Sequence, residues 1–166
     1  MTRPPIRLAS AADSALIADM LARLADEIGD GSRFASTAET IRAHGFGPRP
    51  FFFAFVAGGG SDPQGLALFT RHFSTARGMP GVFLLDLWVA PTMRGSGLGE
   101  RLVRAVARHG ATEWQAGYMA LTVYRDNPDA ARFYARIGFD TRDNDIALSL
   151  AGTAFADMTE PAGDAT

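Results

Sequence analysis

The sequence predicts a single α/β domain with a mixed, mostly antiparallel central sheet. The chain of 166 residues has the length of one domain, and 47% of its residues are hydrophobic, enough for a core. Three apolar runs, at 51–57, 64–73 and 82–89, follow one another through short turns, as antiparallel strands do. A fourth run, 118–124, follows a helical segment, and a strand reached through a crossover helix lies parallel to its partner. Together these runs give a mixed sheet.

The first part of the chain predicts one short strand and two helices. Ile6–Leu8 is the strand, and Ser10 followed by Asp13 is typical of a helix start. The buried stripe of this helix consists of Leu16, Ile17, Met20, Leu21, Leu24 and Ile28. Ser36 with Glu39 has capping-box spacing and predicts a short second helix.

Acidic residues occupy the other face of the first predicted helix. A solvated polar face is one interpretation of Asp26 and Glu27. The other is that these two side chains, with Asp30, border a pocket that attracts a cationic amine.

A strand, a glycine-rich turn and a helix follow one another in residues 82–110. The strand carries one charge, Asp86, and the turn Arg94–Gly99 leads into a helix for which Gly110 offers a stop. A helix that begins on such a turn directs unpaired N–H groups and the positive end of its dipole at an anion. An ordinary turn that needs positive φ would use the same glycines.

Two other phosphate-binding loops do not fit this turn. A nucleotide P-loop needs Gly-Lys-Ser/Thr where this chain has Gly99-Glu100-Arg101. In a dinucleotide fingerprint the last glycine would come one residue later.

Composition excludes several classes of function. The net charge of −2 provides no basic field for nucleic acid, and no basic run or long apolar run favours a membrane. The start of the chain lacks the apolar core of a signal peptide, so a cytoplasmic location is expected. The chain has no cysteine, and all 16 basic residues are arginine, which excludes thiolate and Schiff-base lysine catalysis.

Two motifs in this chain resemble those of the GNAT superfamily of N-acetyltransferases. Arg94, Gly97 and Gly99 match its acyl-CoA loop, which has Arg or Gln, two residues, Gly, one residue, then Gly or Ala. The second motif begins at Asn127, with Phe133 and Tyr134 six and seven residues later and a closing Gly-Phe. The resemblance implies a GNAT-like domain over 1–150 and a C-terminal tail over 151–166.

The resemblance also implies acetyl-CoA as co-substrate, no metal, and a cleft between two splayed parallel strands of a sheet that has helices on both faces. Carried over, the acyl-CoA site consists of Leu87, Trp88 and Val89 of the strand, Arg94, Gly95, Ser96, Gly97, Leu98 and Gly99 of the loop, and Asn127. Capping of the helix that starts with Pro128 explains Asn127 equally well.

The resemblance assigns the catalytic roles as well. Tyr134 matches the tyrosine that protonates the departing thiolate, the alternative being a core tyrosine with its hydroxyl at the rim. Asp86 is the candidate base, acting directly or through water, while Asp26 and Glu27 are the candidate substrate-binding acids. The segments 44–51 and 84–89 resemble the spermidine/spermine acetyltransferase branch, in which an acid commonly stands where this chain has Leu85.

The resulting hypothesis is an acetyl-CoA-dependent N-acetyltransferase acting on a primary amine of a small molecule: a polyamine, a diamine or a lysine-like compound. A protein N-acetyltransferase of the same superfamily and a non-catalytic acyl-CoA sensor are the alternatives, and a nucleotide enzyme is a distant third. Neither nucleic acid nor a membrane is an expected partner, and the resembling branch implies a homodimer.

Overall fold

The structure is a computed structural model that describes residues 3–59, 62–141 and 148–159. The chain forms two compact units, Met1–Ala131 and Arg132–Thr166. The first unit contains every strand of the described residues and is considered first.

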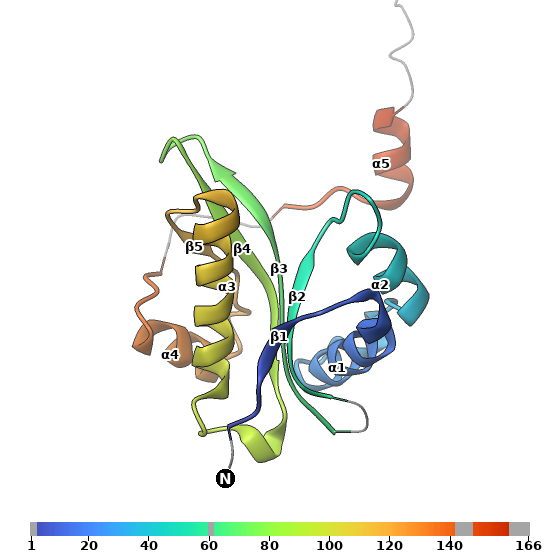
Figure 1. The fold of residues 1–166 in the computed structure, drawn as a ribbon. Coiled ribbons are helices and arrows are strands. Elements are labelled where there is room, and N and C mark those ends of the chain that lie inside the picture. The colour runs from blue at the N-terminus through green and yellow to red at the C-terminus, as the bar shows by residue number, and fades with distance from the viewer. Residues whose placement is uncertain (1–2, 60–61, 142–147, 160–166) are drawn as a thin grey trace, which may run out of the picture. The chain divides into compact units, whose positions relative to one another are not determined.

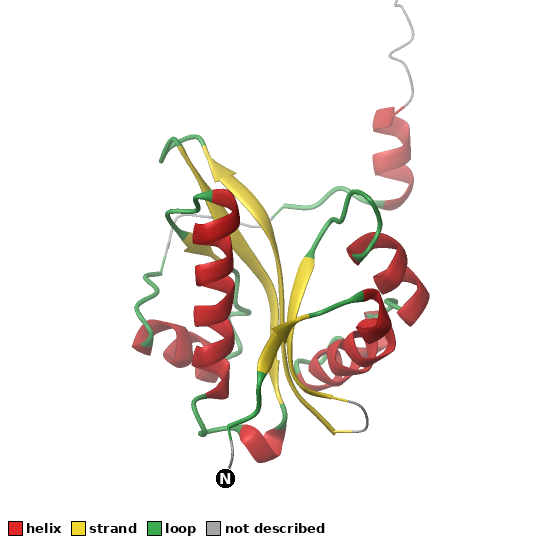
Figure 2. Ribbon diagram, in the orientation of Figure 1, coloured by secondary structure: helices red, strands yellow, loops and turns green. Residues whose placement is uncertain are grey.

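A five-stranded sheet forms the centre of the first unit (Figures 1 and 2). Its strands lie in chain order: β1 (Ile6–Leu8), β2 (Phe53–Gly59), β3 (Asp62–Ser74), β4 (Met79–Val89) and β5 (Met119–Ala120). The first four pair antiparallel, and β5 is parallel to β4. The predicted mixed, mostly antiparallel sheet is confirmed, including the parallel crossover.

Helices cover both faces of this sheet (Figure 1). α1 (Ser14–Glu27) and α2 (Ala38–Gly45) lie on one face, and α3 (Leu98–Trp114) lies on the other. Three short 3-10 turns complete the unit: Ala11–Asp13, Gly31–Arg33 and Pro91–Met93. No helix in the described part of the chain is long and apolar enough to cross a membrane.

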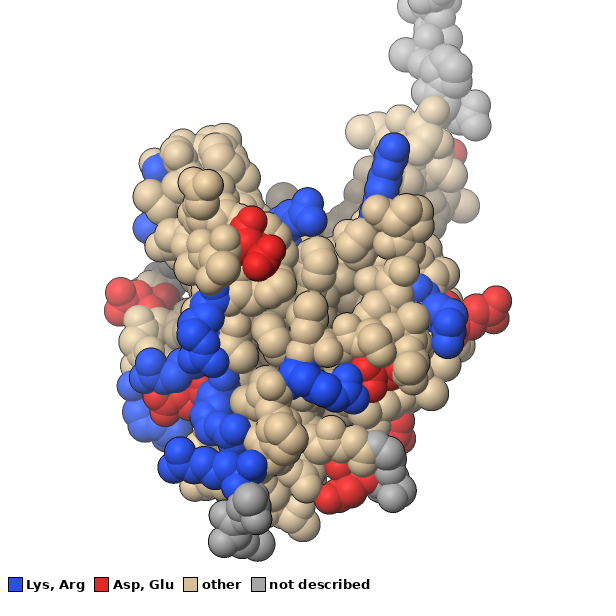
Figure 3. Space-filling model, in the orientation of Figure 1, with Lys and Arg blue, Asp and Glu red and all other residues tan. Residues whose placement is uncertain are grey.

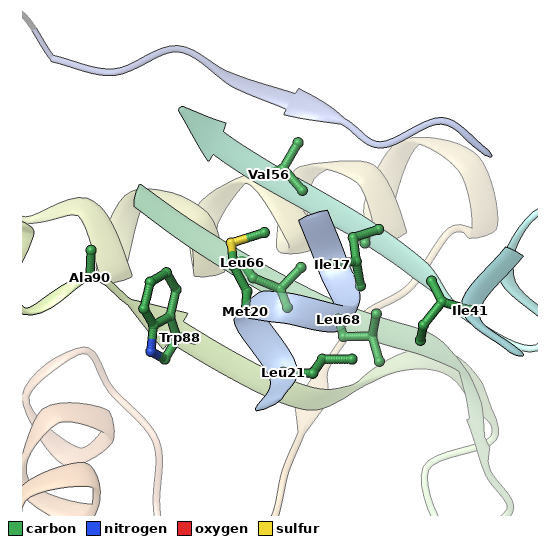
Figure 4. Close-up of a cluster of buried hydrophobic side chains, with 10 residues drawn as sticks. Ile17, Met20, Leu21, Ile41, Val56, Leu66, Leu68, Trp88 and Ala90 are labelled. Carbon is green, nitrogen blue, oxygen red and sulfur yellow. The ribbon is translucent and has the colours of Figure 1, made fainter. Parts of the chain in front are cut away.

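The core beneath α1 is made by the stripe that the sequence predicts (Figure 4). Ile17 and Met20 of α1 are fully buried against Leu66 of β3 and Trp88 of β4. Burying an aliphatic or aromatic side chain of this size stabilises the fold by roughly 1.5–3 kcal/mol. This core fixes α1 on β4, and both elements contribute to the candidate site.

The first helix begins as the sequence predicts, and the second begins one residue later. Ser10 N donates to the Asp13 carboxylate at 2.8 Å, and Arg7 pairs with the same carboxylate. For α2, the predicted Ser36 cap is wrong: Thr37 caps the helix, with its hydroxyl accepting from the N–H of Thr40. The adjacent Thr-x-x-Thr pair satisfies the reciprocal capping geometry itself, so Glu39 falls in the first turn of the helix.

Two predicted element ends are also wrong. α3 continues past Gly110 to Trp114 and ends at Gln115, which adopts the left-handed conformation. A Cβ on Gly110 would lie 2.2 Å from Cγ2 of Val82, so this glycine allows close packing of α3 on β4. β5 is shorter than the predicted 118–124 strand, because pairing with β4 stops after the Phe83–Ala120 pair.

α4 (Pro128–Arg136) crosses into the second unit and has the predicted ends. At its start the Asn127 side-chain oxygen accepts from Ala130 N at 3.1 Å. At its end Gly138 is left-handed, and Phe139 N and Gly138 N donate to the Tyr134 and Ala135 carbonyls, a Schellman motif.

The remainder of the second unit differs from the prediction. The expected closing strands within 139–150 fall partly on 142–147, outside the described residues, and the residues described on either side form no strand. The predicted tail contains a helix, α5 (Gly152–Thr159).

Candidate active site

The turn before α3 presents backbone donors with no side chain over them. Gly95 and Gly97 both have positive φ, at 76° and 81°, which suits glycine, and a Cβ on either would meet nothing within 4 Å. Gly97 is the N-cap of α3 and offers no side-chain acceptor to the N–H groups of Leu98, Gly99 and Glu100, the first turn of the helix. An anion can accept from these groups, favoured by the positive end of the helix dipole.

Within this loop, Ser96 and Arg94 hold the backbone in place. The Ser96 hydroxyl donates to the Met93 carbonyl at 2.6 Å. Arg94 Nε donates to the Val89 carbonyl at 3.1 Å, which ties the loop to the end of β4.

Glu27 of α1 contacts this loop rather than an amine pocket. Its Oε2 pairs with Arg94 Nη2 at 2.5 Å, and its Oε1 accepts from the indole N–H of Trp88 at 3.1 Å. The structure therefore brings Glu27, which the sequence assigns to the amine, together with Trp88 and Arg94, which the resemblance assigns to the acyl-CoA site.

A β-bulge places Asp86 on the α1 side of the sheet. In the register of β3 with β4, Leu68 faces Asp86 and Phe69 faces Leu84, so Leu85 is the extra residue. Val82 lies against Gly110 of α3, and in a regular strand Asp86 would share its face. The bulge reverses this alternation and turns Asp86 toward α1.

The same bulge sets the direction of the backbone N–H groups at the end of β4. The N–H of Val82 donates to Tyr118 on the β5 side, whereas that of Ala90 donates to Gln64 on the β3 side. Counting back from Ala90, alternation directs the N–H groups of Val89 and Leu87 away from β3. Among the described residues, pairing with β5 stops after Phe83, so the N–H groups of Leu87 and Val89 lie along a strand edge that a ligand could use. The N–H of Trp88 points to β3 instead.

Asp86 lines a cavity of about 630 Å³ between α1, α2 and the sheet. The lining residues are Leu21, Leu24, Ala25, Ile28, Asp30, Arg33, Phe34, Ser36, Ile41, Phe52, Leu68, Asp86 and Tyr124. Burial raises the pKa of the Asp86 carboxyl, because a low-dielectric environment disfavours its charged form. A carboxylate with a raised pKa in an otherwise mostly apolar cavity is a candidate base.

A second acid, Asp30, lines the same cavity and has two partners. The Tyr124 hydroxyl donates to its Oδ2 at 2.6 Å, and Arg33 pairs with its Oδ1. The hydrogen bond from Tyr124, followed by that from Arg33, lowers the pKa of Asp30, and Asp30 in turn raises the pKa of Tyr124. The cavity therefore holds an ionised carboxylate beside a protonated phenol at neutral pH.

Sequence reasoning missed Tyr124 and Arg33. Tyr124 falls within the strand predicted over 118–124. In the structure β5 ends at Ala120, and Tyr124 lies in the segment after it, where it lines the cavity. Arg33 lies three residues after Asp30, a spacing that allows an ion pair but does not indicate a cavity.

The other predicted site residues occupy separate places. Asp26 is exposed and does not line the cavity of Asp86. Asn127 caps α4, as described above. Tyr134 belongs to the second unit, where its ring packs edge-on against Phe133 and Phe139 at centroid distances of 5.0 and 5.4 Å.

Two further features lie apart from the glycine loop and the cavity of Asp86. A smaller cavity of about 310 Å³ lies between α3 and the first two strands, lined by Ile6, Phe55, Ala105, Arg108, His109, Thr112 and Glu113. Over residues 3–59, 62–141 and 148–159, no group of three or more His, Asp or Glu side chains is gathered to hold a metal ion. Figure 3 shows arginine side chains on the side of α3. On α3, Arg104 pairs with Glu100, and Arg101 donates to the Pro4 carbonyl.

Comparison with known proteins identifies the family. The model of the acetyltransferase (GNAT) family matches residues 19–139, more than half of the chain. Thialysine N-epsilon-acetyltransferase of Mus musculus is 31% identical over 146 residues, covering 83% of this chain and 85% of that protein. The Bos taurus protein of the same name is 29% identical over 141 residues, covering 80% and 82%.

A solved structure supports the fold. An integron cassette protein from the mobile metagenome of V. cholerae superposes with a TM-score of 0.78 at 18% identity, covering 97% of this chain and 100% of that one. The family model over more than half of the chain and the Mus musculus relative establish that the chain belongs to the acetyltransferase (GNAT) family.

Proposed function

We propose that this acetyltransferase transfers the acetyl group of acetyl-CoA to a primary amine of a small molecule: a polyamine, a diamine or a lysine-like compound. One observation carries the proposal. β4 places Asp86 in an acid-bearing cavity and, within the next three residues, directs two N–H groups to an open edge that leads to the glycine loop. An amine site and an acyl-CoA site would then meet on one strand.

The backbone of the loop fits the pyrophosphate of CoA. Residues 94–99 would hold it through N–H groups at the uncapped start of α3, where Gly95 and Gly97 leave room for close approach. The N–H groups of Leu87 and Val89 would pair with the pantetheine arm, and the thioester carbonyl would accept from the same edge. Asn127 would contact CoA in addition to capping α4.

The amine would bind in the cavity of Asp86 and Asp30. A primary amine has a pKa near 10 and is protonated at neutral pH, so two carboxyl groups attract it. The raised pKa of Asp86 makes this carboxylate a better proton acceptor than an exposed aspartate, directly or through a water. Asp26, outside this cavity, would contribute through its negative charge at the surface.

The transfer itself balances with one acid and one base. The amine loses a proton to Asp86 or water and attacks the thioester carbon, forming a C–N bond. The C–S bond then breaks, and Tyr134 would donate a proton to the departing thiolate. The names of the mammalian relatives support an amine acceptor of this kind.

We also propose a homodimer, as in the branch that the sequence resembles.

A thiol-release assay tests the proposal. The protein is mixed with acetyl-CoA and a panel that includes a polyamine, a diamine and thialysine, and Tyr134→Phe serves as the impaired variant. We expect turnover with at least one amine and a loss of about 10- to 100-fold in kcat for the variant. Binding of acetyl-CoA without any turnover would favour a sensor. Acetylated proteins in a treated lysate, with no small amine accepted, would favour a protein N-acetyltransferase.

A further inference from the structure

We infer that Glu27 of α1 is a positioning residue for the acyl-CoA loop. Its carboxylate holds two groups at once: the guanidinium of Arg94, the first residue of the loop, and the indole N–H of Trp88 in β4. The inference rests on the proposed function, because it assigns a task to the loop. It gives Glu27 a role different from the amine binding that the sequence predicts.

The geometry makes Glu27 the link between the two halves of the acyl-CoA site. Arg94 also bonds the Val89 carbonyl, so the chain of contacts runs from Trp88 through Glu27 and Arg94 back to Val89. Trp88 and Val89 are neighbours at the end of β4, where the N–H of Val89 is proposed for the pantetheine arm, and Arg94 opens the loop proposed for the pyrophosphate. Fixing one half against the other holds the donors at the spacing that a single ligand requires.

A surface ion pair alone would not support this role, because exposed pairs contribute little. Arg94 is 51% exposed and Glu27 36%, but Trp88 is only 2% exposed, so its N–H depends on an acceptor from the protein. Glu27 supplies that acceptor, and the same carboxylate is therefore held in place when it meets Arg94.

The role is specific to Glu27 among the nearby acids of this helix. Asp26 has no contact of this kind, and Asp19 pairs with Arg23 on the exposed face. Asp30, after the end of α1, faces the amine cavity instead. One helix and its end thus supply carboxylates to both proposed sites, three residues apart.

A double-mutant cycle tests this inference. Glu27→Gln keeps an acceptor for Trp88 but removes the charge from Arg94, and Arg94→Gln keeps a residue that the loop pattern allows. We expect Glu27→Gln to raise the KM for acetyl-CoA about 3- to 5-fold with the amine KM unchanged. In the Arg94→Gln background the same change should have no further effect, because the partner is gone.

Asp19→Asn is the matched control, since it removes the same charge and one exposed ion pair from the same helix. It should leave both KM values unchanged. A rise in the amine KM on Glu27→Gln, or additive effects of Glu27→Gln and Arg94→Gln on the KM for acetyl-CoA, would overturn the inference. The Kd for acetyl-CoA, measured by calorimetry on the same variants, tests it even if no amine is acetylated, so its failure is distinguishable from failure of the proposed function.

Discussion

The Tyr124 hydroxyl donates a hydrogen bond to the Asp30 carboxylate at 2.6 Å, although 94 positions separate the two residues. The bond joins the segment after β5 to the end of α1, and both side chains line the cavity of Asp86. The hydrogen bond lowers the pKa of the Asp30 carboxyl and so favours its ionised form.

This relationship leads to an expectation for amine binding. Asp30→Asn removes the negative charge but keeps an acceptor for Tyr124, so we expect the amine KM to rise about 10-fold while the KM for acetyl-CoA is unchanged. Tyr124→Phe keeps the charge and should have a smaller effect. Steady-state kinetics with each substrate varied separately measures both. An unchanged amine KM in Asp30→Asn would place the amine elsewhere.

Asp86 should govern the acidic limb of the pH profile. Its pKa is raised by burial, so the carboxylate form is lost at a higher pH than for an exposed aspartate. As the pH is lowered, we expect kcat/KM to begin to fall at a pH above the usual pKa range of aspartate. Asp86→Asn should remove this acidic limb and lower kcat by about 100-fold.

The stability of the Asp86→Asn variant separates this role from a structural one. A raised carboxyl pKa means that the folded state disfavours the ionised form. The resulting loss in the free energy of unfolding appears as the pH rises above the ordinary pKa of an aspartate. Asp86→Asn removes that loss, so at pH 7 the variant should be at least as stable to denaturant as the parent. A variant that is inactive because it is unfolded would contradict this expectation.

The ionised form of Asp13, unlike that of Asp86, should stabilise the fold. The hydrogen bonds from Arg7 lower its pKa from 3.8 to about 2, so its contribution is present above pH 4 and is lost as pH falls toward 2. The shift corresponds to about 2 kcal/mol at neutral pH. We expect Asp13→Asn to lower the free energy of unfolding by up to this amount at pH 7. The difference should vanish near pH 2, and a difference that persisted there would mean that the loss is not electrostatic.

Gly110→Ala should destabilise the protein although it improves helix propensity. Alanine gains up to about 1 kcal/mol over glycine in a helix. Its Cβ would lie 2.2 Å from Cγ2 of Val82, however, and overpacking of this kind costs about 1–3 kcal/mol. We expect a net loss of about 1–2 kcal/mol in urea unfolding. Shortening the opposing side chain, in the double variant Gly110→Ala with Val82→Ala, should recover part of the clash. A stabilised single variant would show that α3 can move away from β4.

Local signals in the sequence were sufficient for several elements and insufficient for the site. Ile6–Leu8 and the cap at Asn127 were predicted correctly, because strand composition and an N-cap followed by proline act over a few residues. Gly110 was misjudged because a glycine gives the same signal for a helix stop and for close packing on another element.

The arrangement of the candidate site depends on register between strands, which no local pattern encodes. The bulge at Leu85 decides which face Asp86 occupies and which N–H groups reach the open edge. The contacts of Glu27 with Arg94 and of Tyr124 with Asp30 join segments far apart in the chain. The residue types were visible in the sequence, but their partners were not.

A crystal structure with CoA and an amine bound tests the central claim most directly. We expect the pyrophosphate on the N–H groups of Leu98, Gly99 and Glu100 at the start of α3 and the pantetheine arm along Leu87 and Val89. The thiol should lie within reach of the Tyr134 hydroxyl, and the amine should lie beside Asp86. CoA bound away from the glycine loop, or an amine bound outside the cavity of Asp86 and Asp30, would contradict the proposed reaction.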